Sequence, residues 1–142
     1  IGDIDPYWEM NNGRYQQLAD IGRFNHGFRT GFFMKALKNK ISFTVACTAT
    51  KYRYRIPFGK NFTMTTKVIY VDEKWTYYYH EFIYNGRITS TILARTGMVK
   101  NGKLVRSKEA SKIFNLNIPK VELPLWVADW IKSDESNPAF VK

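Results

Sequence analysis

The chain has 142 residues, 44% of them hydrophobic and 16% aromatic, and a formal net charge of +10. This length and composition predict one folded domain with a substantial core and exclude a disordered chain. No apolar run approaches the roughly 20 residues that a membrane-spanning helix requires, so we expect no membrane span. No signal peptide is recognisable, and the abrupt start at Ile1 is compatible with residues lost upstream.

Cysteine and histidine are scarce: the chain contains only Cys47, His26 and His80. A lone cysteine excludes an internal disulfide and fits a reducing compartment, so we expect a cytoplasmic location. These counts are too low for a familiar zinc framework, and we expect no metal site. Cys47 lies on the apolar side of a strand pattern, which is typical of a small buried side chain. Neither histidine has the Ser or Cys neighbours of a catalytic triad.

The positive charge is concentrated in one segment. From Ile21 to Val71 there is no Asp or Glu, and the cations of this segment equal the excess charge of the whole chain. An anionic partner is expected nearby, such as CoA phosphates, an acidic carrier protein, nucleic acid or a lipid surface. A solvated basic face that aids solubility is the competing explanation. The cations are Arg23, Arg29, Lys35, Lys38, Lys40, Lys51, Arg53, Arg55, Lys60 and Lys67.

The first fifteen residues combine carboxylates with a helix start. Pro6 disfavours helix at the preceding residue, so Asp5 is expected on extended chain or in a turn. Asn11 and Asn12 are good N-cap residues, and the helical turn that follows leaves N–H groups without backbone partners. A carboxylate near such donors is the minimum equipment for acyl transfer. The same residue types also form ordinary loops that lead into helices.

This stretch resembles the signature of hotdog-fold acyl-CoA thioesterases of the 4-hydroxybenzoyl-CoA thioesterase type, through Asp3-x-Asp5-Pro6 and Met10-Asn11-Asn12-x-x-Tyr15. The chain departs from one version of the signature by Glu9, where histidine is usual. The resemblance implies that Asp5 attacks the thioester or activates water, and that a backbone N–H at Asn12 or its neighbour polarises the carbonyl. We assign Asn11 and Tyr15 of the same motif to substrate binding.

A helix is predicted from Asn12 to about Asn25, because apolar positions recur at helical spacing. A second apolar face, containing Phe24 and Phe28, predicts that other structure wraps this helix. Gly22 would allow a neighbouring segment to approach closely, and a short second helix follows from Gly31 to Lys40. Asp20 lies eight residues after Asn12, about 12 Å along the helix. The resemblance makes Asp20 an alternative catalytic carboxylate, because some hotdog thioesterases place theirs on the central helix.

Alternating apolar residues from Ile41 to Thr50 predict a half-buried strand. The alternation then changes phase, which indicates a bulge or bend near Ala49 to Tyr52. The phase change places Lys51, Arg53 and Arg55 on one face, and we assign these three cations to CoA phosphate binding. Because relatives bind CoA through later strands, four more cations are candidates: Arg95, Lys100, Lys103 and Arg106.

Three more strands are predicted from their composition and turns, at Phe62–Val71, Lys74–Tyr84 and Arg87–Val99. Asn85-Gly86 and Asn101-Gly102 are strong signals for type I′ hairpins. Aromatic residues at 75 and 77–79 would suit base stacking, but they are also favoured in strands and cores. A helical segment, a proline-bounded connector and a last helix with Trp126 and Trp130 on one face complete the chain.

Together these features predict an α+β hotdog fold, a long central helix wrapped by a curved antiparallel sheet. We expect one domain over 1–142, with a first strand that is short or truncated at Ile1–Asp3 and a C-terminal helical extension over 107–142. The resemblance implies a homodimer or homotetramer that hydrolyses acyl-CoA without a cofactor. The alternatives are an acyl- or lipid-binding hotdog protein without turnover and, less favoured, a basic nucleic-acid binder; we expect no nucleic-acid partner.

Overall fold

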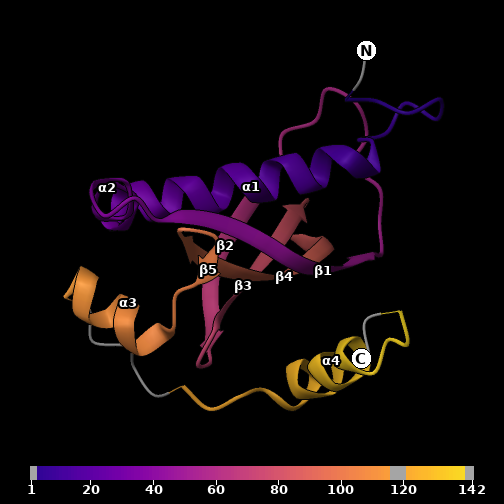
Figure 1. Ribbon diagram of the computed structural model, residues 1–142. Helices are drawn as coiled ribbons and strands as arrows, with labels where there is room; N and C mark the ends of the chain where they lie inside the picture. The colour runs from indigo at the N-terminus through magenta and orange to yellow at the C-terminus, as the bar shows by residue number, and fades with distance from the viewer. Residues whose placement is uncertain (1–2, 116–120, 140–142) are drawn as a thin grey trace.

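The structure is a computed structural model that describes residues 3–115 and 121–139. Helices cover both faces of a five-stranded antiparallel sheet (Figure 1). This is the α+β hotdog layout that the sequence predicts. The elements in chain order are α1 (Asn12–Arg29), α2 (Phe32–Lys38), β1 (Ser42–Tyr52), β2 (Thr63–Val71), β3 (Trp75–Tyr84), β4 (Arg87–Lys100), β5 (Lys103–Leu104), α3 (Ser107–Phe114) and α4 (Leu125–Glu135).

The strands lie in the order β1-β4-β3-β2, and β5 pairs with the end of β4. Asn85 and Gly86 join β3 to β4 with φ values of 50° and 73°. Asn101 and Gly102 join β4 to β5 with φ values of 51° and 75°. Positive φ at both central residues defines a type I′ turn, which matches the twist of the flanking strands. Both predicted hairpins are therefore confirmed.

The edge strand β1 differs from its sequence prediction. Among the described residues β1 pairs with β4 alone, and its side chains Phe43 and Val45 are 39% and 44% exposed. The register of β1 against β4 shifts between Val45 and Cys47, so the predicted bulge near Ala49 to Tyr52 is wrong in position. The phase change after Ala49 instead marks the approach to the strand's end, where the chain leaves the sheet after Tyr52.

Helix α1 lies across one face of the sheet and buries Tyr15, Ala19 and Gly22 against it. It continues to Arg29, beyond the predicted end, and the chain turns at Gly31, whose φ is 70°. The second apolar face of α1 is only partly covered: its residues Ile21, Phe24 and Phe28 are 56%, 50% and 53% exposed. In the single chain, the sheet therefore covers α1 on one side only.

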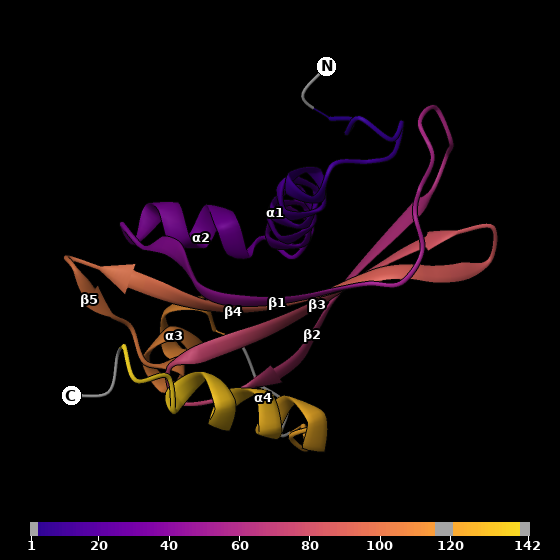
Figure 2. The ribbon, with the colours of Figure 1, turned by 90° about the vertical axis from the view of Figure 1, so that its right-hand side faces the viewer.

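Helix α4 covers the opposite face of the sheet (Figure 2). Trp130 meets Tyr77 edge to face at 6.4 Å between ring centroids, and Trp126 meets Tyr79 at 5.4 Å. Both tryptophans therefore contact the sheet of their own domain. Asp134 of α4 also forms an ion pair with Arg95 of β4, which ties the end of the helix to the sheet.

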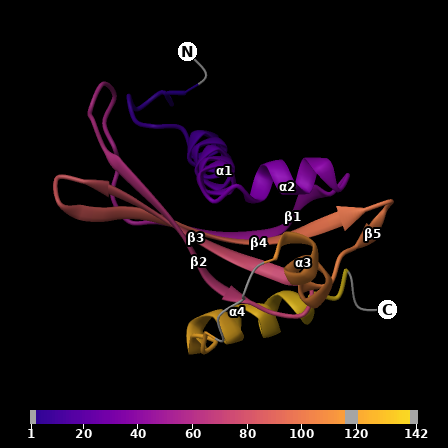
Figure 3. The ribbon, with the colours of Figure 1, turned by 90° about the vertical axis from the view of Figure 1, so that its left-hand side faces the viewer.

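Helix α3 packs near α2 at one end of the sheet (Figure 3). The rings of Phe32 and Phe114 lie 4.4 Å apart, and Lys35 Nζ donates to the Phe114 carbonyl at 2.7 Å. At the other end, Ile4 forms an isolated bridge with Met10 in place of a first strand; residues 1–2 lie outside the described part. Within the described residues, no helix has the length and hydropathy needed to span a bilayer.

Candidate functional site

Asp5 lies in a compact turn, as its position before Pro6 predicts. Its Oδ1 atom accepts the backbone N–H of Tyr7 at 2.9 Å and that of Glu9 at 3.1 Å. Its own N–H donates to the Glu9 carbonyl at 3.0 Å. Among the described residues no hydrogen bond uses Oδ2 of Asp5. The turn therefore fixes the carboxylate through one oxygen and leaves the other for a ligand.

The start of α1 lies beside this turn. Asn11 is the N-cap residue, and its side-chain oxygen accepts the Gly13 N–H at 2.8 Å. The bridge between Ile4 and Met10, and the bond from the Asn11 N–H to the Asp3 carbonyl at 3.0 Å, hold the Asp5 turn against the helix start. Within residues 3–115 and 121–139, the Asn12 N–H has no acceptor.

The segment after β1 forms backbone hydrogen bonds with the same turn. The Met10 N–H donates to the Ile56 carbonyl at 3.0 Å, and the Phe58 N–H donates to the Trp8 carbonyl at 2.9 Å. Glu9, which stands where the related signature has histidine, forms an ion pair with Arg55 at 3.3 Å. Of the three cations predicted to bind phosphate, Arg55 is thus the one that the fold brings against the Asp5 turn.

The other predicted binding residues are placed differently. Lys51 and Arg53 are exposed at the end of β1, where the Arg53 N–H donates to the Thr89 carbonyl at 2.8 Å. Tyr15 is buried and packs against the rings of Phe82 and Tyr52 at 4.9 and 5.2 Å. Burial also raises the pKa of the Tyr15 hydroxyl. Its contact with a substrate stays a prediction, as do those of Asn11 and the cations.

Asp20 lies farther along α1, at the exposed end of a series of hydrogen-bonded side chains. Its carboxylate pairs with Arg23, whose Nη1 lies 3.0 Å from Nε2 of His80. Since a guanidinium only donates, Nε2 must accept, and the Nδ1 N–H donates to Thr66 Oγ1 at 2.9 Å. Burial and then the charge of Arg23 lower the pKa of His80 to about 3. His80 is therefore a satisfied neutral histidine.

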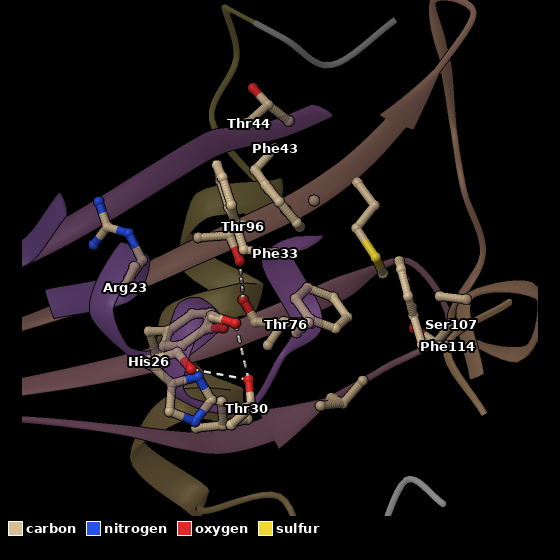
Figure 4. A pocket seen from close by; sticks show the side chains of 18 of the residues that line it. Arg23, His26, Thr30, Phe33, Phe43, Thr44, Thr76, Thr96, Ser107 and Phe114 are labelled. Atoms are coloured by element: carbon tan, nitrogen blue, oxygen red, sulfur yellow. Dashed lines mark hydrogen bonds between the residues drawn. The ribbon is translucent and has the colours of Figure 1, made fainter. Parts of the chain in front are cut away.

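A cavity of about 600 Å³ lies between the C-terminal half of α1 and the sheet, with α2 and α3 at its sides (Figure 4). Asp20 and Arg23 belong to its lining, but Asp5, Asn12 and the other predicted site residues do not. The sequence missed this cavity because its walls come from elements far apart in the chain. Its apolar lining includes Phe24, Phe32, Phe33, Phe43, Val45, Val68, Tyr70, Tyr78, Met98 and Phe114.

Arg95, a further candidate for phosphate binding, does not line the cavity. The Arg95 guanidinium is held under α4, 5.4 Å from the Trp75 ring and 5.7 Å from the Trp130 ring. These contacts, with its ion pair to Asp134, make it a packing residue rather than a free phosphate ligand. The part of the chain that the structure describes contains no group of three or more His, Cys, Asp or Glu side chains arranged to hold a metal ion.

Sequence comparison relates the chain to thioesterases. The profile of the thioesterase-like superfamily matches residues 1–131. Protein THEM6 of Danio rerio is 34% identical over 102 residues, which cover 70% of this chain and 50% of that protein. Across three THEM6 relatives, the matched part is only 42% to 65% of the relative's length.

Structural comparison gives the same fold. Gentisyl-coenzyme A thioesterase BH1999 matches with a TM-score of 0.67 and 16% identity, over 82% of this chain and 94% of that one. A thioesterase from Thermus thermophilus, solved with coenzyme A and Zn, matches with a TM-score of 0.65 and 15% identity, over 82% and 90%. At these identities the likeness establishes the hotdog fold alone.

Proposed function

Because the chain belongs to the thioesterase-like superfamily, we propose that it is an acyl-CoA thioester hydrolase, which releases a carboxylic acid and free CoA. The observation that carries this proposal is the Asp5 turn, fixed beside the first amide of α1. Coenzyme A in a structural neighbour adds support for a CoA thioester over other acyl donors.

The chemistry requires a carboxylate and an oxyanion donor. Asp5 would either attack the thioester carbonyl through Oδ2 or take a proton from the attacking water. If Asp5 attacks, the C–S bond breaks to leave an acyl-aspartyl anhydride, and water cleaves that anhydride to give the acid and the free carboxylate. If Asp5 activates water, the water oxygen bonds to the carbonyl carbon as the C–S bond breaks. In both versions the proton released by water passes to the CoA thiolate. The free N–H of Asn12 would stabilise the oxyanion, a contribution of about 3–4 kcal/mol where such donors have been removed in other enzymes.

Asp20 is the alternative catalytic carboxylate. Three observations favour it: its side chain is exposed, it borders the cavity, and Arg23 holds its orientation. In this version the cavity would receive the acyl group directly, and Asp5 would only stabilise its turn. The two versions predict opposite results for the two Asp→Asn substitutions described below.

Exposed cations and an unpaired edge suggest how substrate and partner would bind. Lys51, Arg53 and Arg55 would contact CoA phosphates close to the Asp5 turn.

The unpaired edge of β1 and the exposed apolar face of α1 favour a homodimer or homotetramer. Sedimentation at micromolar concentration should therefore show no monomer; a monomer alone would contradict this assembly. A cytoplasmic location remains a proposal that rests on Cys47.

The second candidate function is acyl or lipid binding without turnover. The cavity supports it directly, and Glu9 in place of the usual histidine removes one residue of the related signature. The deciding experiment is a panel of aryl-, short-chain and long-chain acyl-CoA thioesters, assayed with a reagent that traps the released thiol. Turnover of any member above the rate of a heat-denatured control supports the hydrolase. No release across the panel contradicts it and leaves the binding function.

A further inference from the structure

Aromatic side chains project into water at the Asp5 turn and at the turn beside it. Tyr7 and Trp8 are 79% and 71% exposed, and Phe58, which follows β1, is 57% exposed. The ring centroids of Trp8 and Phe58 lie 6.0 Å apart. Figures 2 and 3 show the two segments side by side, beyond the N-terminal end of α1. We call Tyr7, Trp8 and Phe58 the aromatic patch.

The backbone fixes these rings in their exposed positions. Trp8 has a φ of 59°, in the left-handed region that bulky residues rarely adopt. Its N–H donates to the Asp5 carbonyl at 3.1 Å, and its carbonyl accepts the Phe58 N–H at 2.9 Å. Gly59, with a φ of 70°, turns the chain directly after Phe58. The exposure therefore belongs to two hydrogen-bonded turns rather than to a loose loop.

Cations without acidic partners accompany the aromatic patch. The segment 53–62 between β1 and β2 contains no Asp or Glu. On the Asp5 turn, Asp3 and Glu9 are each paired with an arginine, at 3.5 and 3.3 Å. Arg53 and Lys60 form no ion pair within residues 3–115 and 121–139. Their charges are thus available to an anionic partner.

A partner for this surface must accept exposed aromatic rings and cations together. Tryptophan and tyrosine favour the headgroup level of a bilayer, where the ring meets apolar groups and its polar edge stays hydrated. Lysine and arginine nearby attract anionic lipids. A single nucleotide base would cover one ring and leave the others in water. A nucleic-acid strand would require a continuous track of cations, which the paired arginines of this turn do not supply.

We propose that the aromatic patch docks on the surface of an anionic lipid bilayer. Tyr7, Trp8 and Phe58 insert between the lipid headgroups, and Arg53 and Lys60 attract the lipid phosphates. This is attachment to a membrane surface without a span. The Asp5 turn then faces the bilayer. Docking does not depend on thioester hydrolysis, so it can be tested apart from the proposed function.

Vesicle pelleting makes the first test. The full chain is mixed with vesicles of phosphatidylcholine and phosphatidylserine in equal parts, at low salt, and centrifuged. It should pellet with these vesicles and bind vesicles of phosphatidylcholine alone at least about tenfold more weakly. High salt should release most of the bound protein. Absence of pelleting, or equal binding to both kinds of vesicle, would overturn the proposal.

A double substitution locates the contact. Trp8→Ala with Phe58→Ala should lower the partition coefficient on the mixed vesicles at least about tenfold, because two inserted rings are lost. The matched control is Met34→Ala with Leu37→Ala on α2, where the side chains are 51% and 54% exposed. It should change binding by less than about twofold. Equal losses in the two variants, or no loss in the first, would overturn the proposal.

A charge reversal tests the same surface should the aromatic variant fail to fold. Lys60→Glu, in an exposed turn, should weaken binding to the mixed vesicles at least about fivefold. Lys38→Glu on α2 changes the net charge equally but lies at the other end of α1, so its effect should stay below about twofold. Equal effects would indicate attraction by net charge alone and would overturn the proposal.

Two measurements without vesicles test the other occupants of this surface. The parent chain and the Trp8→Ala, Phe58→Ala variant should have the same sedimentation coefficient. Loss of an assembly in the variant would show that a second copy of the chain covers the patch, and would overturn the proposal. A single-stranded oligonucleotide should bind both proteins equally weakly. Tight binding that the same variant abolishes would assign the patch to nucleic acid and likewise overturn the proposal.

Discussion

The two ends of α1 carry different features of the candidate site. At the N-terminal end, Asp5 and the backbone amide of Asn12 lie in a surface turn and do not line the cavity described above. Toward the C-terminal end, Asp20 and Arg23 border an apolar cavity. Figure 1 shows the turn at one end of the helix and α2 and α3 at the other. The recognisable motif and the cavity are thus separate within one chain.

The largest expected effect distinguishes the two carboxylates. Asn keeps the size of Asp but removes its charge and its basicity, so the substitution at the catalytic residue should lower kcat by about two orders of magnitude or more. We predict this loss for Asp5→Asn, with a much smaller change for Asp20→Asn. Steady-state thiol release measures both. The reverse ranking would move the chemistry to the cavity, and two fully active variants would rule out both carboxylates.

Gly22 lies between the two ends of α1, where the helix approaches side chains of β2 closely. A Cβ there would collide with Thr66 Oγ1 and would lie 2.8 Å from Met64 Cε. Gly22→Ala should therefore lower the free energy of unfolding by about 1–3 kcal/mol, measured by urea denaturation.

Gly27→Ala is the control on the same helix. Its nearest neighbour would be Phe33 Cβ at 3.5 Å, an ordinary contact. The better helix propensity of alanine should make this variant neutral or more stable by up to about 1 kcal/mol. Equal losses in the two glycine variants would show that the close approach at Gly22 is not what limits substitution.

His80 should make the free energy of unfolding depend on pH. It is neutral in the folded protein because its pKa is lowered from 6.5 to about 3. Between these values the unfolded chain binds the extra proton, so stability should fall as the pH falls, by up to about 1.4 kcal/mol per pH unit.

His80→Gln removes the titrating group and keeps one donor for Thr66 and one acceptor for Arg23. Urea unfolding across the same pH window should show a flatter slope for this variant than for the parent chain. Parallel slopes would mean that His80 is protonated equally in the folded and unfolded states.

The smallest effect concerns the cations near the Asp5 turn. Changing Lys51, Arg53 and Arg55 together to Gln should raise KM for acyl-CoA by about threefold to tenfold with kcat unchanged, because exposed ion pairs are individually weak. The control changes three exposed cations at the other end of α1, Arg29, Lys38 and Lys40, so that net charge falls equally. An equal rise in KM for both sets would indicate general electrostatic attraction rather than a phosphate site.

Features that depend on neighbouring residues in the sequence were predicted correctly. The Asn-Gly turns, the Asn11 cap and the Asp5 turn depend on residues close in sequence, and the structure places each as expected. The β1 bulge was misplaced because alternation in sequence does not reveal where a strand leaves its only neighbour. No local pattern could have paired Arg23 with His80, which lie 57 residues apart.

The cavity was unpredictable for the same reason. It forms where α1, α2, α3 and four strands meet, and its lining residues read in sequence as ordinary strand and helix residues. The signature identified a candidate for the chemistry, whereas the site that could select the acyl group depends on tertiary packing. Sequence motifs of this length therefore carry more information about reaction type than about substrate.

The packing of Arg95 between Trp75 and Trp130 gives the protein built-in optical probes. Three of its four tryptophans, those at 75, 126 and 130, lie with α4 on one face of the sheet, whereas Trp8 is 71% exposed beside the Asp5 turn. Intrinsic emission therefore combines three indoles of the α4 layer, of which Trp126 is 50% exposed, with the more exposed indole of Trp8. A Trp8→Phe background would restrict the signal to the α4 layer, so that detachment of this helix could be timed separately from events at α1.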